Sequence, residues 1–351
     1  MSALSAGSDS MNKFNWDWNL SEVKQDKPVK VFSCFACGGG SCMGYKRAGF
    51  EVLGCVEIDP AINAMYRKNL NPKYNFLMDL REFNKLEEIP EELIGVDILD
   101  GSPPCTTFSS AGRREETWGK EKVFREGQAK QTLDDLFFVF LDTVGKLQPR
   151  VVIAENVSGL IKGKAKGYVH EIVARFKELG YAVQIFHLNA AHMDVPQARH
   201  RVFFAATREK KPPLRLSFDH DLIPFGKIRT ESGIPMNEGT VMANLAAAAK
   251  EGETNLSEVA KRIAGEKNKY FTTYINWDKD VCVTVTSSAR HVRGYDRQYM
   301  SDEDIRRAQT FPEDYDFNGN DPLYVCGMSV PPNMMANIAT EVYDQWLSGR
   351  I

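Results

Sequence analysis

One stretch of sequence decides the fold that we predict, Val31-Phe32-Ser33-Cys34-Phe35-Ala36-Cys37-Gly38-Gly39-Gly40-Ser41. A strand-like apolar run, residues 31–35, leads into three glycines, and a short helical pattern follows and ends at Gly49. A strand, a glycine turn and a helix in this order bring backbone N–H groups close to a bound cofactor. A glycine turn alone is weak evidence, so the prediction depends on the segments that follow.

The second predicted strand, residues 52–56, ends in Glu57, about seventeen positions after Gly40. An acidic residue near this offset, at the end of the second strand, suits a nucleoside ribose whose two hydroxyls need acceptors. Asp59 and Pro60 then begin another helix, as a cap residue and a first-turn proline do. This pair of segments strengthens the case for a nucleoside-binding turn.

Further apolar runs alternate with helical patterns along the chain. We expect strands at residues 75–77, 96–99, 151–154, 183–188 and 202–206, and helices at residues 133–144 and 169–179. Strands that alternate with helices build an open α/β sheet of the Rossmann-like type. In such sheets the ligands bind at the carboxyl ends of the strands.

Polar side chains follow several of these predicted strands. Cys105 lies in a Pro-rich turn, residues 100–109, directly after the fourth strand, and Glu155 and Asn156 end the next one. A single cysteine is often a small buried hydrophobe, so Cys105 alone is a weak signal. Glu155 should lie beside it in one cleft, because neighbouring parallel strands end at the same edge. Asp79 should end the third strand, although a plain turn aspartate is an equal alternative.

Two further segments belong to the same predicted cleft. Arg199 and Arg201 alternate as they enter a strand, so their side chains should point the same way. Residues 113–131 are rich in glycine and in charges of both signs, without periodicity. A long structureless segment inside a compact domain is usually a functional lid or a disordered loop. Because it follows Cys105 directly, we favour the lid.

Composition limits the class of protein. The chain has 351 residues, 43% hydrophobic and 26% charged, with a formal net charge of -3, so any nucleic-acid surface must be local. It contains no apolar run long enough for a membrane span, and residues 1–28 lack a signal pattern. Seven cysteines are an odd number for a disulfide framework and fit a reducing, cytosolic compartment. The cysteines near residue 37 lack the paired knuckles of a zinc site, and we expect no metal.

Eight short motifs, in this order, resemble those of the DNA cytosine-5 methyltransferase family. The resemblance covers residues 31–347. The motifs are the turn from Phe35 to Gly40, Glu57, Asp79, Pro104-Cys105, Glu155-Asn156-Val157, Gln197-x-Arg199-x-Arg201, Arg307-x-Gln309-x-Phe311-Pro312 and Gly327-x-Ser329-Val330. One such match is weak evidence, but eight in the order of the family are strong evidence.

The resemblance implies four catalytic residues. Cys105 would add as a thiolate to carbon 6 of cytosine, since carbon 5 is by itself a poor nucleophile. Glu155 would share a proton with N3 of the base, and Arg201 would hold its carbonyl oxygen. Arg199 would orient the thiol loop or the DNA backbone. The target base must be flipped out of the duplex to be reached.

The resemblance also implies S-adenosyl-L-methionine as the methyl donor. It assigns Glu57 to the ribose, Asp79 to the adenine and Leu136 to the adenosine pocket. The further cofactor residues are Phe35, Gly38, Gly39, Gly40, Ile58, Pro104, Met328 and Val330. Three positions depart from the family. Cys37 stands where glycine is usual and Met328 where asparagine is usual, and both bear on how the donor is held. Glu303-Asp304 stands where the family has an Arg-Glu pair.

We expect four regions in the chain. They are a polar tail at residues 1–28, a catalytic and cofactor-binding domain at 29–210, a smaller target-recognition domain at 211–317, and a C-terminal helix at 318–351 that returns to the catalytic domain. The resemblance implies double-stranded DNA as the partner, no membrane, a monomer in the cytoplasm of a bacterium or encoded by a phage, and a cognate restriction endonuclease.

Three other functions compete with this interpretation. A tRNA cytosine-5 methyltransferase shares the chemistry but usually carries a different recognition insert, and labelled cofactor with DNA or tRNA would separate the two. A catalytically silent DNA-binding relative would not need Cys105, Glu155 and Arg201 together, and an adduct with 5-fluorocytosine DNA would exclude it. A dinucleotide oxidoreductase would share the glycine turn, but it has no need of the Pro-Pro-Cys and Glu-Asn turns.

Overall fold

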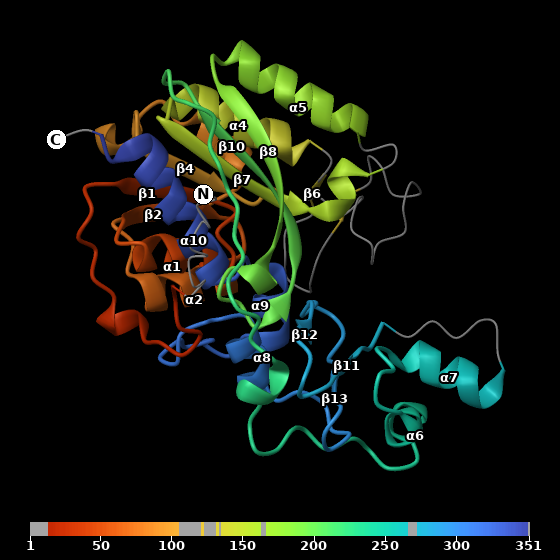
Figure 1. The fold of residues 1–351 in the computed structure, drawn as a ribbon. Helices are drawn as coiled ribbons and strands as arrows, with labels where there is room; N and C mark the ends of the chain where they lie inside the picture. The colour runs from red at the N-terminus through yellow and green to blue at the C-terminus, as the bar shows by residue number, and fades with distance from the viewer. Residues whose placement is uncertain are drawn as a thin grey trace, which may run out of the picture.

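A computed structural model describes residues 13–104, 121–122, 131–132, 135–162, 166–265 and 272–349. At its centre lies a seven-stranded sheet with the order β3-β2-β1-β4-β7-β10-β8 (Figure 1). The strands are β1 (Lys30–Cys34), β2 (Glu51–Glu57), β3 (Tyr74–Leu77), β4 (Ile98–Gly101), β7 (Val151–Val157), β8 (Ala182–Asn189) and β10 (His200–Thr207). The predicted α/β, Rossmann-like sheet is confirmed.

Further strands are added on both sides of the central pair β1 and β4. β1 pairs in parallel with β2 on one side and with β4 on the other, and β4 pairs in parallel with β7. β10 is antiparallel to both of its neighbours, β7 and β8. The gap between the ends of β1 and β4 is therefore the topological switch point, where open α/β sheets bind their ligands.

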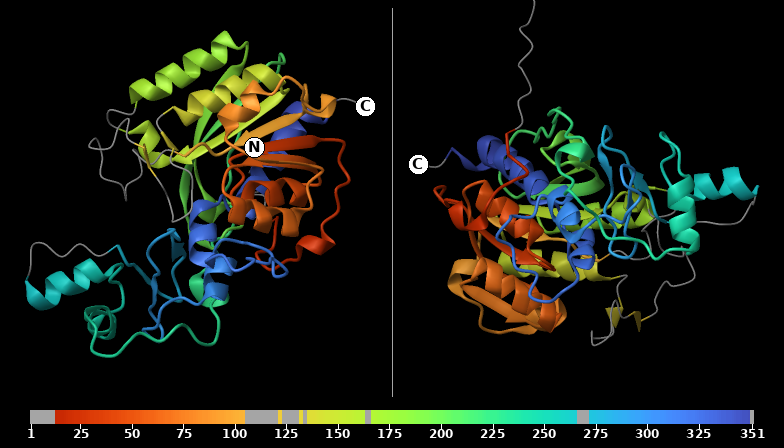
Figure 2. Two further views of the ribbon diagram at one scale, coloured as in Figure 1. Left: turned by 180° about the vertical axis from the view of Figure 1, so that it is seen from behind. Right: turned by 90° about the horizontal axis from the view of Figure 1, so that it is seen from below.

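Helices cover both faces of the sheet (Figures 1 and 2). One face packs against α1 (Gly40–Arg47), α2 (Pro60–Leu70) and α10 (Pro332–Val342), and the other against α3 (Leu80–Lys85), α4 (Leu136–Leu147) and α5 (Lys166–Glu178). Successive strand residues alternate between the two cores: Val31 lies in the first and Phe32 in the second. This alternation places Ser33 and Asp100 on the α1 side.

A smaller group of elements stands apart from the sheet. It contains α6 (Val241–Ala248), α7 (Leu256–Ala264), β11 (Ile275–Asn276) and β13 (Val292–Arg293), with an apolar cluster of its own. Figures 1 and 2 show α6 and α7 well away from the central sheet. Between the two parts, β12 (Cys282–Val283) pairs with β9 (Gln197–Ala198), and α8 (Asp302–Ala308) and α9 (Pro322–Met328) follow. The domain boundaries at residues 210 and 317 stay predictions.

Three regions differ from the sequence-based expectations or fall outside the described residues. Asp79 does not end β3; it caps α3, a helix that we did not predict, and accepts a hydrogen bond from the N–H of Arg81. Trp18, in the predicted tail, is buried and its indole N–H donates to the carbonyl oxygen of Thr310 at 2.9 Å. Of the predicted lid, the structure describes only β5 (Glu121–Lys122) and β6 (Gln131–Thr132), which pair antiparallel. None of the described helices is long and apolar enough to cross a membrane.

Candidate active site

The turn after β1 has an unusual backbone. Phe35, Cys37 and Gly39 all have positive φ angles, of 57°, 46° and 78°. Glycine adopts this left-handed region freely, whereas a residue with a Cβ atom is strained there. Cys37, which departs from the family pattern, therefore occupies a position whose backbone conformation favours glycine.

The same turn packs closely against the segment that follows α9. A Cβ atom on Gly40 would lie 2.1 Å from the carbonyl oxygen of Val330, which leaves no room for any other residue. The phenolic O–H of Tyr315 donates to the carbonyl oxygen of Gly38 at 2.7 Å. These contacts fix the turn as a rigid cradle at the end of β1.

Glu57 ends β2 beside this cradle and is only 8% exposed. Its carboxylate accepts hydrogen bonds from the backbone N–H groups of Cys37 at 2.9 Å, Ile58 at 2.9 Å and Asp59 at 3.0 Å. Burial raises the pKa of Glu57, and the three backbone donors act in the opposite direction. A carboxylate has about four acceptor positions, so capacity remains for a ligand hydroxyl.

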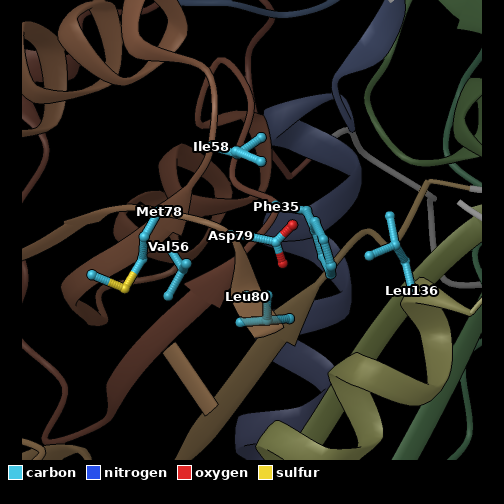
Figure 3. Close-up of a pocket in the computed structure, with 7 residues that line it drawn as sticks. All are labelled: Phe35, Val56, Ile58, Met78, Asp79, Leu80 and Leu136. Atoms are coloured by element: carbon cyan, nitrogen blue, oxygen red, sulfur yellow. The ribbon is translucent and has the colours of Figure 1, made fainter. Parts of the chain in front are cut away.

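Two pockets open at the carboxyl edge of the sheet, and Phe35 lines both. The first is mostly apolar and is lined by Phe35, Val56, Ile58, Met78, Asp79, Leu80 and Leu136 (Figure 3). Asp79 is its acidic side chain, and Arg81 pairs with Asp79 at 3.2 Å. Apolar walls with a few polar groups are typical of sites for small flat ligands.

The second pocket lies at the switch point between β1 and β4. It is lined by Phe35, Ala36, Cys37, Gly40, Ser41, Asp100, Ser102, Met328, Ser329 and Val330. Of the predicted cofactor residues, Phe35, Gly40, Met328 and Val330 therefore lie together here, while Ile58, Asp79 and Leu136 line the first pocket. Pro104 is partly buried at the end of the described segment that contains β4.

Two of the four predicted catalytic residues lie on the neighbouring strands β7 and β10. Glu155 on β7 pairs with Arg201 on β10, with 2.8 Å between Oε1 and Nε, and both side chains are largely buried. The neighbouring Asn156 donates from Nδ2 to the carbonyl oxygen of Pro103 at 3.1 Å. Cys105 itself lies outside the described residues. Glu155 therefore lies on the strand next to β4 and to the segment that leads directly into Cys105.

Arg199 has a different environment from Arg201. It is 2% exposed, and it donates to the carbonyl oxygens of Val285 at 2.9 Å and Gly327 at 2.8 Å. Burial lowers the pKa of Arg199 well below its usual value, and Arg201 lowers it further. Arg199 thus connects the turn before β10 to the end of α9, where the second pocket begins.

The sequence was compared with known protein families and structures. Residues 29–344 match the family of C-5 cytosine-specific DNA methylases. The chain belongs to this family. It is therefore a DNA cytosine-5 methyltransferase, and the predicted family and activity are confirmed.

Curated relatives agree with this assignment, and solved structures share the fold. The methyltransferase is 28% identical to the Type II methyltransferase M.NgoPII of Neisseria gonorrhoeae, over 90% of this chain and 95% of the relative. It is 30% identical to the Type II methyltransferase M1.HphI of Haemophilus parahaemolyticus, over 88% and 85%. Among solved structures, DNMT2 of Spodoptera frugiperda has a TM-score of 0.60 at 15% identity, covering 90% of this chain and 99% of that one. At this identity the last comparison shows the fold alone.

Three sequence motifs of the methyltransferase, far apart in the chain, meet in one polar network. The side-chain N–H of Gln197 donates to Oε1 of Gln309 at 2.7 Å, and Gln309 donates to the carbonyl oxygen of Ser329 at 2.6 Å. All three side chains are buried. The network fixes the segment 327–330 against β9, just before β10, which explains why the motifs need amide side chains.

Sequence reasoning missed several residues of the methyltransferase's two pockets. Val56, Met78 and Leu80 are direct neighbours of predicted residues, so their places follow once the strands are known. Asp100 and Ser102 in the second pocket were not predicted as site residues. A charged residue directly after the apolar run 96–99 was the available signal, because a buried strand rarely ends in an acid without a reason.

Proposed function

We propose that this methyltransferase transfers a methyl group from S-adenosyl-L-methionine to carbon 5 of a flipped-out cytosine in double-stranded DNA, through a covalent adduct of Cys105. The observation that carries the proposal is the Glu155–Arg201 pair, in which Glu155 lies on β7, the strand beside β4 and the segment that leads into Cys105. Glu155 and Arg201 are 2.8 Å apart, and Asn156 beside them holds Pro103. Both pockets open at the same edge of the sheet.

The residues present fit the methyl donor. The first pocket offers apolar walls and Asp79 for an adenine, Glu57 has remaining acceptor capacity for a ribose hydroxyl, and Gly40 of the cradle lines the second pocket. Gly38 and Gly39 complete that cradle. When bound, the sulfonium group supplies an electrophilic methyl carbon. Met328, 39% exposed, and Val330 border the second pocket at its far side.

The chain's own residues would perform the remaining chemistry. The thiolate of Cys105 forms a bond to carbon 6, and the electron pair of the C5–C6 double bond becomes available at carbon 5. Glu155 gives a proton to N3 as negative charge develops on the ring, while Arg201 stabilises the carbonyl oxygen and orients Glu155. After carbon 5 has gained the methyl group, a base takes its proton, the C–H electron pair re-forms the C5–C6 double bond, and the pair of the C6–sulfur bond returns to Cys105 as a thiolate. N3 then gives its proton back to Glu155.

Arg199 would act as a positioning residue. Its guanidinium group donates to backbone carbonyls of Val285 and Gly327, so it holds the wall of the second pocket. From the Type II names of the relatives we also propose a cognate restriction endonuclease. We propose in addition that the enzyme is a monomer and acts in the cytoplasm.

Methyl transfer from labelled S-adenosyl-L-methionine tests the proposal. We expect label in duplex DNA and none in tRNA, and bisulfite sequencing of DNA from expressing cells would identify the target site. Cys105→Ala should abolish transfer and trapping by 5-fluorocytosine duplexes while it spares cofactor binding. Cys55→Ala, which removes a buried thiol outside both pockets, is the matched control. Turnover by Cys105→Ala would refute the covalent mechanism.

The donor assignment has a separate test. Glu57→Ala should weaken the binding of S-adenosylhomocysteine by about tenfold or more, because a buried carboxylate that accepts a ligand hydroxyl is lost. An unchanged dissociation constant would contradict the ribose role of Glu57. It would not bear on the role of Cys105, which the transfer experiment tests separately.

A further inference from the structure

Asp100 is a buried carboxyl group at the switch point between β1 and β4. It is 2% exposed, and it lines the second pocket. Its Oδ2 accepts a hydrogen bond from the hydroxyl of Ser33 at 2.8 Å, and its Oδ1 accepts one from the phenol of Tyr45 at 3.2 Å. Among the residues that the structure describes, no Lys, Arg or His forms an ion pair with it.

This environment is unfavourable for a carboxylate without a cation. Two neutral hydroxyl donors satisfy about half of its acceptor positions, and an uncompensated buried charge is costly. Burial, together with the nearby charge of Glu155, raises the pKa of Asp100 to about 7 although the Ser33 and Tyr45 hydroxyls lower it. The carboxyl group of Asp100 therefore needs either a bound proton or a neighbouring positive charge.

The surroundings of Asp100 in the second pocket indicate what supplies that charge. The side chains that line this pocket include no Lys, Arg or His, so Asp100 is its one charged group among the described residues. Helix α1 begins at Gly40, which also lines this pocket, with no side-chain cap. The pocket therefore offers a carboxylate at one point and the start of a helix at another, which suits a zwitterion with an ammonium and a carboxylate group.

We propose that Asp100 binds the ammonium group of the amino-acid end of the methyl donor, and that this contact selects donors with a free α-amino group. The inference rests on the proposed function, because it takes S-adenosyl-L-methionine as the ligand. Asp100 is 2% exposed and directly follows Leu99 on β4, so an ion pair with a ligand would form in a water-poor site. The hydroxyls of Ser33 and Tyr45 donate to this carboxyl group as neutral partners and supply no charge.

Binding of three adenosine thioethers to the full chain, measured by calorimetry, tests this inference. The ligands are S-adenosylhomocysteine, its analogue in which hydrogen replaces the amino group, and 5′-methylthioadenosine, which lacks the whole amino-acid end. We expect the unmodified protein to bind S-adenosylhomocysteine about 10- to 100-fold more tightly than the des-amino analogue, the range of a charge-assisted hydrogen bond.

The Asp100→Asn variant should reduce this preference to about threefold or less and should leave the binding of 5′-methylthioadenosine unchanged. Tyr45→Phe is the matched control, because it removes a neutral donor from the same carboxyl group and should keep the preference. Equal binding of S-adenosylhomocysteine and the des-amino analogue by the unmodified protein would overturn the inference, and this comparison needs no variant to fold. Equal loss of all three ligands in Asp100→Asn would overturn it too, since that result indicates a structural role.

These outcomes separate this inference from the proposed function. If methyl transfer to DNA proceeds and S-adenosylhomocysteine binds without any contribution of its amino group, only the role of Asp100 fails. If none of the three thioethers binds and no methyl group is transferred, the donor assignment itself fails, and the role of Asp100 fails with it.

Discussion

Asn156 on β7 donates a hydrogen bond from Nδ2 to the carbonyl oxygen of Pro103, 3.1 Å away, and so ties the segment before Cys105 to the neighbouring strand. The same strand carries Glu155, which pairs with Arg201. Two adjacent residues of β7 therefore have separate tasks: one faces the ion pair and the other fixes the loop. This division explains why Glu and Asn follow each other at the end of a buried strand.

Replacement of Asn156 should affect catalysis more than cofactor binding. In Asn156→Ala the carbonyl oxygen of Pro103 loses its buried donor, which costs about 1–3 kcal/mol of folding free energy and loosens the segment before Cys105. We expect kcat to fall at least about tenfold with little change in the KM for the donor, measured by steady-state methyl transfer.

Asn84→Ala is the control for this prediction, because Asn84 also donates from its side chain to a backbone carbonyl, that of Val139 at 3.0 Å on α4. It should lower thermal stability and leave kcat unchanged. If both variants lower kcat equally, the effect of Asn156 is one of general stability.

Replacement of Gly40 should disrupt the cradle. The added Cβ atom of Gly40→Ala would lie 2.1 Å from the carbonyl oxygen of Val330, so the segment 327–330 must shift. Such overpacking typically costs about 1–3 kcal/mol, and the displaced wall should weaken S-adenosylhomocysteine binding at least about tenfold. Chemical unfolding and calorimetry measure the two effects.

Gly167→Ala on α5 is the matched control, since a Cβ atom there meets nothing within 4 Å. Alanine is the better helix former, so stability should stay the same or rise slightly. A normal affinity in Gly40→Ala would show that the cradle does not contact the donor.

At position 37 a glycine should give a more stable protein than an alanine, which is the reverse of the usual order. The φ of 46° at Cys37 lies in the left-handed region, where a residue with a Cβ atom loses about 1–2 kcal/mol. Glycine loses about 0.5–1 kcal/mol through backbone entropy, so Cys37→Gly should be more stable than Cys37→Ala by about 0.5–1 kcal/mol. Both variants remove the thiol, and urea unfolding compares them directly. Greater stability of the alanine variant would contradict the strained backbone at this position.

The stability of the donor-free protein should depend on pH through Asp100. Burial raises its pKa to about 7 in the folded protein, above the value near 3.8 of an ordinary Asp. The folded state therefore binds the proton of Asp100 more tightly than the unfolded state does. The resulting contribution to the free energy of unfolding is fully present below about pH 4 and is lost as the pH rises through 7. The free energy of unfolding should fall across this range by about 2–4 kcal/mol more than in Asp100→Asn.

Urea unfolding at pH 5 and pH 8 measures this difference. Other titratable groups act on the same carboxyl: Glu155 on β7, and the buried Cys34, Cys42 and Tyr45, whose pKa values burial raises so that they stay neutral here. Because both proteins share these groups, the difference isolates Asp100. Parallel pH profiles for the two proteins would contradict the raised pKa.

Local sequence patterns were sufficient for much of the fold. The alternation of apolar runs and helical patterns predicted the sheet, because burial of strand and helix faces imposes a period that single segments display. The glycine turn with Glu57 followed from the same reasoning, since a strand, a tight turn and a helix leave few other arrangements. The helix α3 was missed because its six residues are too few for a periodic pattern, and Asp79 therefore became its cap unexpectedly.

The sequence by itself determined which residues end the strands, and hence that Glu57 and Glu155 gather at one edge of the sheet. Only the tertiary structure decided which groups touch: that Arg199 binds the carbonyls of Val285 and Gly327, that Gln197 reaches Gln309, and that Asp100 has hydroxyl neighbours and no cation among the described residues. The physical reason is that strand ends follow from local hydrophobic periodicity, whereas these contacts join segments that are up to 128 residues apart and depend on the register and packing of the whole chain.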